Sequence, residues 1–222
     1  MIRTIIFDIG NVLADFNWRA YLDSFALPEQ EDRIVERTLF LSPLWAEIDR
    51  GRLSDEELLA QICKSAPEQE MLIRRVYSGA GMAVSQNTYA PGLLKRLKEL
   101  GYQIYILSNY GKTFYEERLS NFEFLRYSDG QVISYQEQYI KPEPEIYQIL
   151  LSRYQICPEE AVFFDDLPKN LETAKTFGIN TVQVRGYESI EEGLRSFDIE
   201  PVSYTHLGAL LKSFRHTCLC CC

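Results

Sequence analysis

Three carboxylates follow two of the short apolar segments in this 222-residue chain. Asp8 comes directly after TIIF, and Asp165 and Asp166 come directly after AVFF. A carboxylate is costly to bury unless it is paired or holds a metal ion. If the two segments are neighbouring strands, the three acids meet at one edge of a sheet and repel one another unless a cation lies among them. Oxygen ligands without a nearby histidine or cysteine suit Mg²⁺, so the sequence predicts a magnesium site.

Further polar groups complete a candidate phosphate site. Ser108 and Asn109 come after YQIYIL, and Lys141 lies in YIKPEP. Together with Mg²⁺, Lys141 would bind a dianionic phosphate, Ser108 would donate a hydrogen bond to it, and Asn109 would contact the substrate. Asp8 could then attack phosphorus and form an aspartyl-phosphate intermediate. Taken singly, each of these residues also fits a turn or a helix cap, but their joint occurrence at strand ends favours a site.

The turn after Asp8 contains Gly10 and Asn11. Glycine allows a backbone to approach a phosphate closely, so that backbone groups rather than bulky side chains face it. We therefore include Asn11 among the substrate-binding candidates.

Alternating helix and strand patterns position these residues. Pro91 stands near the start of a segment whose leucines share one helical face, Gly101 stands at its end, and YQIYILSN follows as a strand. The same order recurs in KPEPEIYQILLSRY before AVFFDD, and in PKNLETAKTFG before TVQV. Helices alternating with apolar strands indicate an α/β fold with a doubly wound parallel sheet, whose ligands bind beyond the carboxyl ends of the strands.

A helical stretch interrupts this pattern after the first strand. Ser54 is a good N-cap for DEELLAQICK, with Glu57 three residues later, and EQEMLIRRVYSG predicts a second helix that ends at Gly79. The predicted units are a core at residues 1–16 and 88–200, an inserted helical cap at 17–87 and a separate tail at 201–222.

The overall charge points to a small soluble ligand. A formal net charge of -9 argues against nucleic acid or an anionic membrane as the partner, because both bind to clusters of Lys and Arg. No apolar run approaches the ~20 residues of a membrane span, and the N-terminus has no signal-peptide core. We expect a cytoplasmic protein that acts on a small-molecule phosphate ester, and its oligomeric state is left open.

The C-terminal tail is excluded from these inferences. VSYTHL at 202–207 resembles a translated sequencing-adapter end, and four of the six cysteines fall in the last five positions. We expect the native chain to end near Pro201, with a metal-binding cysteine tail as the alternative. His206 and His216 are assigned no chemistry, and no disulfide framework is evident.

Four motifs together resemble those of the haloacid dehalogenase superfamily: FDIGNV, ILSN, IKPEPEIY and FFDDLPKN, in that order. The resemblance extends to its subfamily with a small helical cap of the C1 type. It implies an α/β core with an inserted cap, a magnesium-dependent phosphatase activity and specific residue roles. Those roles are Asp8 as nucleophile, the Gly10 carbonyl and Asp166 as magnesium ligands, Asp165 and Asn170 as their support, and Ser108 and Lys141 on the phosphate.

Gly10 departs from the pattern of most phosphatases in that superfamily. They carry a second aspartate two residues after the nucleophile, as the general acid and base. A subset that resembles glucose 1-phosphate phosphatases and carries FDLGNV shares the glycine. Because general acid catalysis is typically worth ~100- to 10,000-fold, we expect a preference for anomeric, aryl or acyl phosphates over alkyl phosphates such as glycerol phosphate. Asp15 could supply the missing proton, with a hinge or helix-capping role as its alternative.

The sequence therefore predicts a magnesium-dependent phosphatase for a small phosphorylated metabolite such as a hexose 1-phosphate. In the cap, Trp45, Glu47 and Arg52 could meet the substrate, although a tryptophan is often core and a charge is often solvated. Two alternatives stay open. One is a non-catalytic protein of the same fold that binds a phosphate ligand, and the other is a haloacid dehalogenase, which would need no metal.

Overall fold

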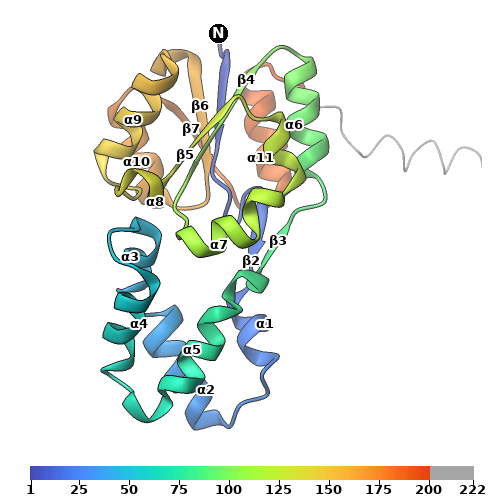
Figure 1. Ribbon diagram of the computed structural model, residues 1–222. Helices are drawn as coiled ribbons and strands as arrows, with labels where there is room; N and C mark the ends of the chain where they lie inside the picture. The colour runs from blue at the N-terminus through green and yellow to red at the C-terminus, as the bar shows by residue number, and fades with distance from the viewer. Residues whose placement is uncertain (201–222) are drawn as a thin grey trace, which may run out of the picture.

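A five-stranded parallel sheet forms the upper lobe of the computed structural model, which describes residues 1–200 (Figure 1). The strand order is β5-β4-β1-β6-β7, so the doubly wound α/β fold predicted from the sequence is confirmed. The strands of this sheet are β1 (Thr4–Phe7), β4 (Gln103–Ser108), β5 (Gly130–Ile133), β6 (Ala161–Asp165) and β7 (Asn180–Gln183). The expectations for the tail at 201–222 lie outside the described residues.

The central strand β1 explains why its sequence is apolar throughout. All four of its residues are buried, because β4 and β6 pair with its two edges and helices cover both faces of the sheet. Ile5 and Phe7 point into one hydrophobic cluster and Ile6 into another, as the two-residue period of a strand requires. In the paired register, Phe7 lies opposite Ile106 and Phe164, so β1, β4 and β6 run toward the same edge of the sheet.

Helices lie on both sides of this sheet (Figure 1). One face is covered by α6 (Ala90–Glu99) and α11 (Tyr187–Ser196), and the other by α9 (Pro144–Tyr154) and α10 (Pro168–Thr176). Two shorter helices, α7 (Lys112–Glu117) and α8 (Ser134–Glu137), follow β4 and β5. Among residues 1–200, no helix combines the length and apolar character needed to cross a bilayer.

A separate helical lobe packs around its own hydrophobic cluster (Figure 1). Its helices are α1 (Trp18–Asp23), α2 (Glu29–Val35), α3 (Trp45–Arg50), α4 (Asp55–Cys63) and α5 (Glu70–Ser78), with a π-helical turn at Glu36–Phe40. Two short antiparallel strands, β2 (Ala14–Phe16) and β3 (Val84–Gln86), connect this lobe to the sheet lobe. The stretch predicted as mainly helical thus ends in a strand, which pairs with the outgoing chain.

Local sequence signals account for several of these boundaries. Ser54 and Glu57 form the reciprocal capping box expected at the start of α4. Pro91 lies in the first turn of α6, and Gly101 follows that helix with a φ of 92°, a left-handed conformation that favours glycine. Strand β5 was not predicted, because its apolar pattern is limited to Val132 and Ile133, which are the two buried residues of the strand.

Candidate active site

Three carboxylates converge at the carboxyl ends of β1 and β6. Each of Asp8, Asp165 and Asp166 offers an oxygen, and these oxygens lie within 4.8 Å of one another. Asp8 is 7% exposed and Asp165 is fully buried. The parallel pairing of β1 with β6 brings together residues more than 150 positions apart, as the sequence predicted. Such a concentration of negative charge is stable only with cations at hand.

One of those cations is the buried ammonium group of Lys141. Its Nζ lies 2.8 Å from Asp8 Oδ1 and 2.7 Å from Asp165 Oδ2. Burial by itself lowers the pKa of Lys141, but the charges of Asp165 and Asp8 outweigh it and raise the pKa above its ordinary value. Lys141 is therefore charged, and it bridges the two strand ends.

Asp8 is oriented from two sides. Its Oδ1 accepts a hydrogen bond from the Ile9 backbone N–H at 2.7 Å and forms an ion pair with Lys141 Nζ. Burial raises the pKa of Asp8 to about 7, and Lys141 opposes that rise while Asp165 adds to it. The contacts with Ile9 and Lys141 both involve Oδ1, so the orientation of the carboxylate is set by that oxygen.

Asp165 is held by a dense set of hydrogen bonds. Asn170 Nδ2 donates to both of its oxygens at 3.0 Å, and the Leu167 backbone N–H donates to Oδ1 at 2.8 Å. The Tyr147 hydroxyl in turn donates to the Asn170 carbonyl at 2.9 Å. With Lys141 also on Oδ2, both oxygens of Asp165 are occupied by protein groups. This carboxylate is better placed to hold Lys141 than to bind a metal directly.

Asp166 is half-buried and has fewer partners than Asp165. Asn11 Nδ2 donates to its Oδ2 at 3.0 Å, and Gln183 Nε2 donates to its backbone carbonyl at 3.2 Å. Asn11 has a φ of 53°, so its side chain turns back toward β6 from a left-handed backbone. Burial raises the pKa of Asp166, and the hydrogen bond from Asn11 opposes the rise. Asp166 remains accessible to a ligand.

The end of β4 supplies the remaining candidates. Ser108 is 1% exposed, and its hydroxyl makes no completed hydrogen bond, although it lies close enough to Asp8 to favour the charged carboxylate. Asn109 exchanges two hydrogen bonds with the Lys141 backbone, donating to its carbonyl at 3.0 Å and accepting from its N–H at 2.7 Å. The Ser108 hydroxyl can therefore form a hydrogen bond with a ligand in the site. The Asn109 side chain instead holds the backbone of Lys141 in place.

A cavity of about 100 Å³ lies between the two lobes, next to these strand ends. Its walls are mostly aromatic and aliphatic. The lining residues are Gly10, Phe16, Trp45, Asp49, Ala80, Val84, Asn109, Tyr110 and Phe114. Trp45 is thus placed where it could meet a substrate. Sequence reasoning missed Asp49, because one acid in the segment IDRG gives no signal that distinguishes it from a solvated charge.

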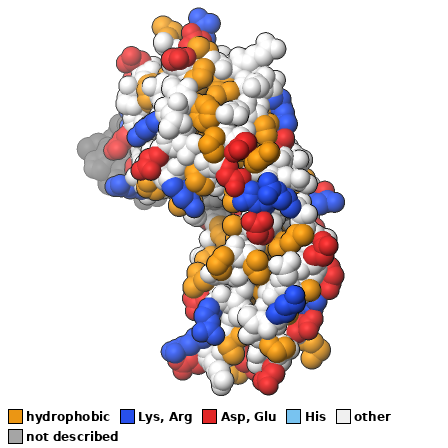
Figure 2. Space-filling view, turned by 90° about the vertical axis from the view of Figure 1, so that its left-hand side faces the viewer, with side chains coloured by type: hydrophobic (Ala, Val, Ile, Leu, Met, Phe, Trp, Pro, Cys, Tyr) orange, Lys and Arg blue, Asp and Glu red, His pale blue; other side chains and the backbone are white. Residues whose placement is uncertain are grey.

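The other two candidates from the helical lobe, Glu47 and Arg52, do not line this cavity. Glu47 pairs with Arg50, whose Nη1 also lies 2.7 Å from Glu143 Oε2 in the sheet lobe. Arg52 lies over the Tyr139 ring. Figure 2 shows basic and acidic side chains close together on the face where the two lobes meet. The Arg50–Glu143 ion pair and the Arg52–Tyr139 contact connect the lobes, and none of these four residues lines the cavity.

Asp15 and Gly10 differ in how they relate to the site. Asp15 is exposed on β2 and does not line the cavity. At Gly10, a Cβ atom would meet nothing within 4 Å. Packing therefore does not impose glycine at this position, and the missing side chain is a chemical feature of the site.

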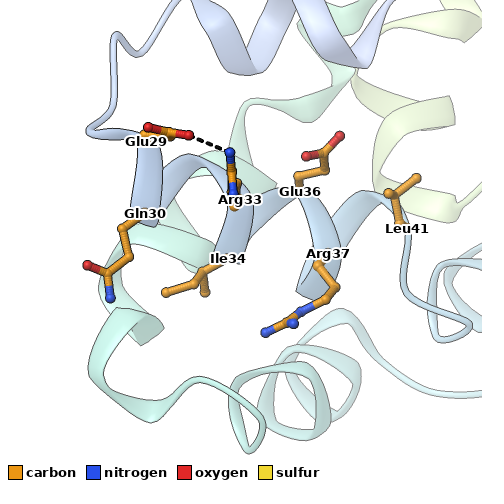
Figure 3. Close-up of a pocket in the computed structure, with 7 residues that line it drawn as sticks. All are labelled: Glu29, Gln30, Arg33, Ile34, Glu36, Arg37 and Leu41. Atoms are coloured by element: carbon orange, nitrogen blue, oxygen red, sulfur yellow. Dashed lines mark hydrogen bonds and ion pairs between the residues drawn. The ribbon is translucent and has the colours of Figure 1, made fainter.

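A wider, open hollow of about 760 Å³ lies on α2 and the π-helical turn of the helical lobe (Figure 3). Its labelled side chains come from one helical stretch, and Glu29 and Arg33 pair with each other there. None of the cluster residues lines this hollow, so it is separate from the acidic site.

The donor set fits a hard divalent cation. The cluster offers carboxylate oxygens without histidine or cysteine, and a single lysine leaves three carboxylates undercompensated. The half-buried Asp166 and the free Ser108 hydroxyl are the groups with capacity for added ligands.

Comparisons with known proteins agree with this reading of the fold. A family model for haloacid dehalogenase-like hydrolases matches residues 2–178. The D-ribitol-5-phosphate phosphatase of Bacteroides thetaiotaomicron is 25% identical over 197 residues, covering 82% of this chain and 92% of the relative. The phosphorylated carbohydrates phosphatase of Thermotoga maritima is 26% identical over 188 residues, covering 81% and 83% of the two chains.

Solved structures show the same fold. A HAD-like hydrolase from Porphyromonas gingivalis superposes with a TM-score of 0.71 at 23% identity, covering 89% of this chain and 98% of that one. A HAD family enzyme from Bacteroides thetaiotaomicron, solved with magnesium and inorganic phosphate, gives a TM-score of 0.67 at 22% identity, covering 83% and 95%. With the family model matching most of its length, the chain belongs to the haloacid dehalogenase-like hydrolases.

Proposed function

We propose that the protein is a magnesium-dependent phosphatase that hydrolyses a small phosphorylated metabolite through an aspartyl-phosphate on Asp8. The observation that carries this proposal is the pairing of a buried, oriented aspartate with a buried lysine inside an all-oxygen acidic cluster. A lysine held there can meet a phosphate dianion, and an aspartate held there can act as a nucleophile. The phosphatase names of the two relatives support the same reaction class.

Each residue then has a separate role. Asp8, Asp166 and the Gly10 carbonyl would hold Mg²⁺, which when bound supplies charge neutralisation for the phosphate. Asp165 and Asn170 keep Lys141 in place, as their hydrogen bonds indicate. The donors for the phosphate oxygens would be Lys141 Nζ, the Ser108 hydroxyl and the backbone around Asn11.

In the first step, an oxygen of Asp8 attacks phosphorus while the bond to the leaving oxygen breaks. Asp8 Oδ2 is the oxygen available for this attack, because Oδ1 already contacts Lys141 and the Ile9 N–H. In the second step, water attacks the phosphorus of the aspartyl-phosphate and releases inorganic phosphate. Both steps develop charge next to Lys141, which stabilises it electrostatically.

We further propose that the helical lobe acts as a cap over this site. A cavity of about 100 Å³ is smaller than the ~300–1,000 Å³ of common ligand pockets, so the lobes must separate to admit a substrate. The Arg50–Glu143 ion pair joins the lobes in the closed arrangement. A phosphorylated sugar is the substrate class that the relatives' names favour, and a hexose 1-phosphate is the candidate from the FDIGNV motif.

Phosphate release from p-nitrophenyl phosphate by the full chain tests the reaction class. We expect turnover with Mg²⁺, none with EDTA, and none for Asp8→Asn, whereas Asp198→Asn makes the same chemical change at an exposed position and leaves turnover intact. Binding of phosphate without turnover would instead support the non-catalytic alternative. Chloride release from a 2-haloacid in EDTA would support a dehalogenase.

A further inference from the structure

The end of helix α3 is fixed against the sheet lobe next to the cavity. The Ser134 hydroxyl donates a hydrogen bond to the Asp49 carbonyl at 2.6 Å and accepts one from the Tyr110 N–H at 2.8 Å. A Cβ at Gly51, where φ is 72°, would lie 2.8 Å from backbone atoms of Tyr135. A Cβ at Gly111 would lie 2.7 Å from a side-chain carbon of α3. The two surfaces touch so closely that α3 has a defined position over the site.

That position places one carboxylate on the wall opposite the strand ends. Among the residues that line the cavity, Asp49 is the one with a carboxyl group, and Gly10 and Asn109 line the same space. The remaining walls are largely apolar and contain Trp45 and Phe114, so they exclude water around this carboxyl group. Asp49 therefore shares the cavity with Gly10, the position at which the proton-transferring aspartate of the sequence pattern is missing.

The charged and titratable groups around Asp49 come from several elements. Burial raises the pKa of Asp49 to about 7, and the charge of Asp8 adds to the rise, while the Gly111 backbone N–H and Lys141 oppose it. Tyr77 on α5 and Tyr110 after β4 also face it. A carboxyl group that can exist in both protonation states near neutral pH suits a group that gives and then regains a proton.

Three other acids near the lobe junction lie outside the cavity. Asp15 is exposed on β2, Glu47 pairs with Arg50, and Asp55 accepts a hydrogen bond from the Thr113 hydroxyl. None of these three lines the cavity. Of the described residues, Asp49 is thus the best-placed carboxyl group for proton transfer to a leaving group.

We propose that Asp49 is the catalytic acid and base of this enzyme and replaces, from the helical lobe, the carboxylate missing at Gly10. The inference rests on the phosphatase proposed above. As Asp8 attacks phosphorus and the bond to the leaving oxygen breaks, the Asp49 carboxyl proton moves to that oxygen and an alcohol leaves. Water then attacks the aspartyl-phosphate, its proton returns to Asp49, the bond between phosphorus and Asp8 breaks, and inorganic phosphate leaves.

This assignment changes the expectation for leaving groups. Without an acid, the wild-type rate should depend steeply on the pKa of the leaving alcohol, as the sequence alone suggested. With Asp49 as the acid, that dependence is shallow in the wild type and steep in Asp49→Asn. Glycerol phosphate therefore becomes an informative substrate, because its leaving group needs the proton most.

The test compares kcat/KM for glycerol phosphate and p-nitrophenyl phosphate in wild type, Asp49→Asn and the exposed-site control Asp198→Asn. For glycerol phosphate, we expect kcat/KM of Asp49→Asn to fall about 100-fold or more. For p-nitrophenyl phosphate, we expect a much smaller loss in the rate at which the aspartyl-phosphate forms. Rapid mixing should then show a burst of p-nitrophenol, since the second step loses its base. The fall of wild-type kcat/KM at high pH should be absent in Asp49→Asn.

Two further variants keep the outcome interpretable. Gly10→Asp combined with Asp49→Asn should recover activity on glycerol phosphate, because a Cβ at Gly10 has open space around it. Asp49→Glu should retain part of the activity, and thermal unfolding shows whether each variant folds. Equal losses on both substrates, or no loss, would overturn the role of Asp49. No phosphate release by the wild type would overturn the phosphatase proposal itself.

Discussion

Replacing Lys141 with methionine should test the electrostatic account of the site most directly. Lys141 is 2% exposed and is the cation that contacts both Asp8 and Asp165, at 2.8 and 2.7 Å. Methionine keeps most of the side-chain volume and removes the charge. The two carboxylates would then be buried without this partner, so the folded state loses stability for an electrostatic rather than a packing reason.

The size of the effect follows from the burial of all three groups. Breaking a buried ion pair by removing one partner costs about 3–5 kcal/mol, because an uncompensated charge remains. For a domain of this size, about 1 kcal/mol shifts Tm by roughly 2–4 °C, so we expect Tm of the metal-free protein to fall by roughly 10 °C. Catalytic turnover should be lost as well, because Lys141 also faces the phosphate in the proposed reaction.

The loss of stability should depend on pH in a defined direction. Removing Lys141 takes away a charge that lowers the pKa of Asp8, so the folded pKa of Asp8 rises beyond about 7 and further above its unfolded value of 3.8. The variant is therefore destabilised most at a pH above the folded pKa of its Asp8. At lower pH, Asp8 becomes protonated and the destabilisation decreases. The difference in Tm between wild type and Lys141→Met should therefore decrease as the pH falls from 8 to 5.

Thermal unfolding in EDTA across that pH range is the assay. Lys175→Met, an identical substitution at an exposed position of α10, is the control and should leave Tm unchanged. In the double variant Lys141→Met with Asp165→Asn, one of the uncompensated charges is gone, so the stability loss should be smaller than the sum of the single losses. A Lys141→Met protein with the Tm of the wild type at pH 8 would show that the charge of Lys141 does not stabilise the buried carboxylates.

Two other substitutions test the supports of the site. Arg50→Ala removes the cation between Glu47 and Glu143. Because a charged hydrogen bond contributes about 1.5–3 kcal/mol, we expect KM to rise about tenfold, with a smaller change in kcat. Steady-state kinetics measure this, and an unchanged KM would contradict the proposed closure. Asn170→Ala removes both amide contacts to Asp165, so the free energy of unfolding should fall by about 1–3 kcal/mol in urea titrations, and an unshifted midpoint would contradict the support role.

The sequence was sufficient for the elements whose signals are local. The α4 capping box, Gly101 after α6 and the apolar run of β1 depend on neighbouring residues, so they can be recognised without a structure. The convergence of Asp8 with Asp165 could also be inferred, because parallel strands end at one edge of a sheet. The edge strand β5 and the pairing of β2 with β3 lacked such signals.

Hydrophobic periodicity and the order of the elements along the chain are enough to predict a doubly wound α/β fold with an acidic cluster at its strand ends. Which groups act together depends on contacts that form only in the folded chain. The tertiary structure showed that both oxygens of Asp165 are occupied and that Asp15 is exposed away from the cavity. It also placed Asp49 in the same cavity as Gly10, because the docking of one lobe on another depends on contacts between residues distant in sequence.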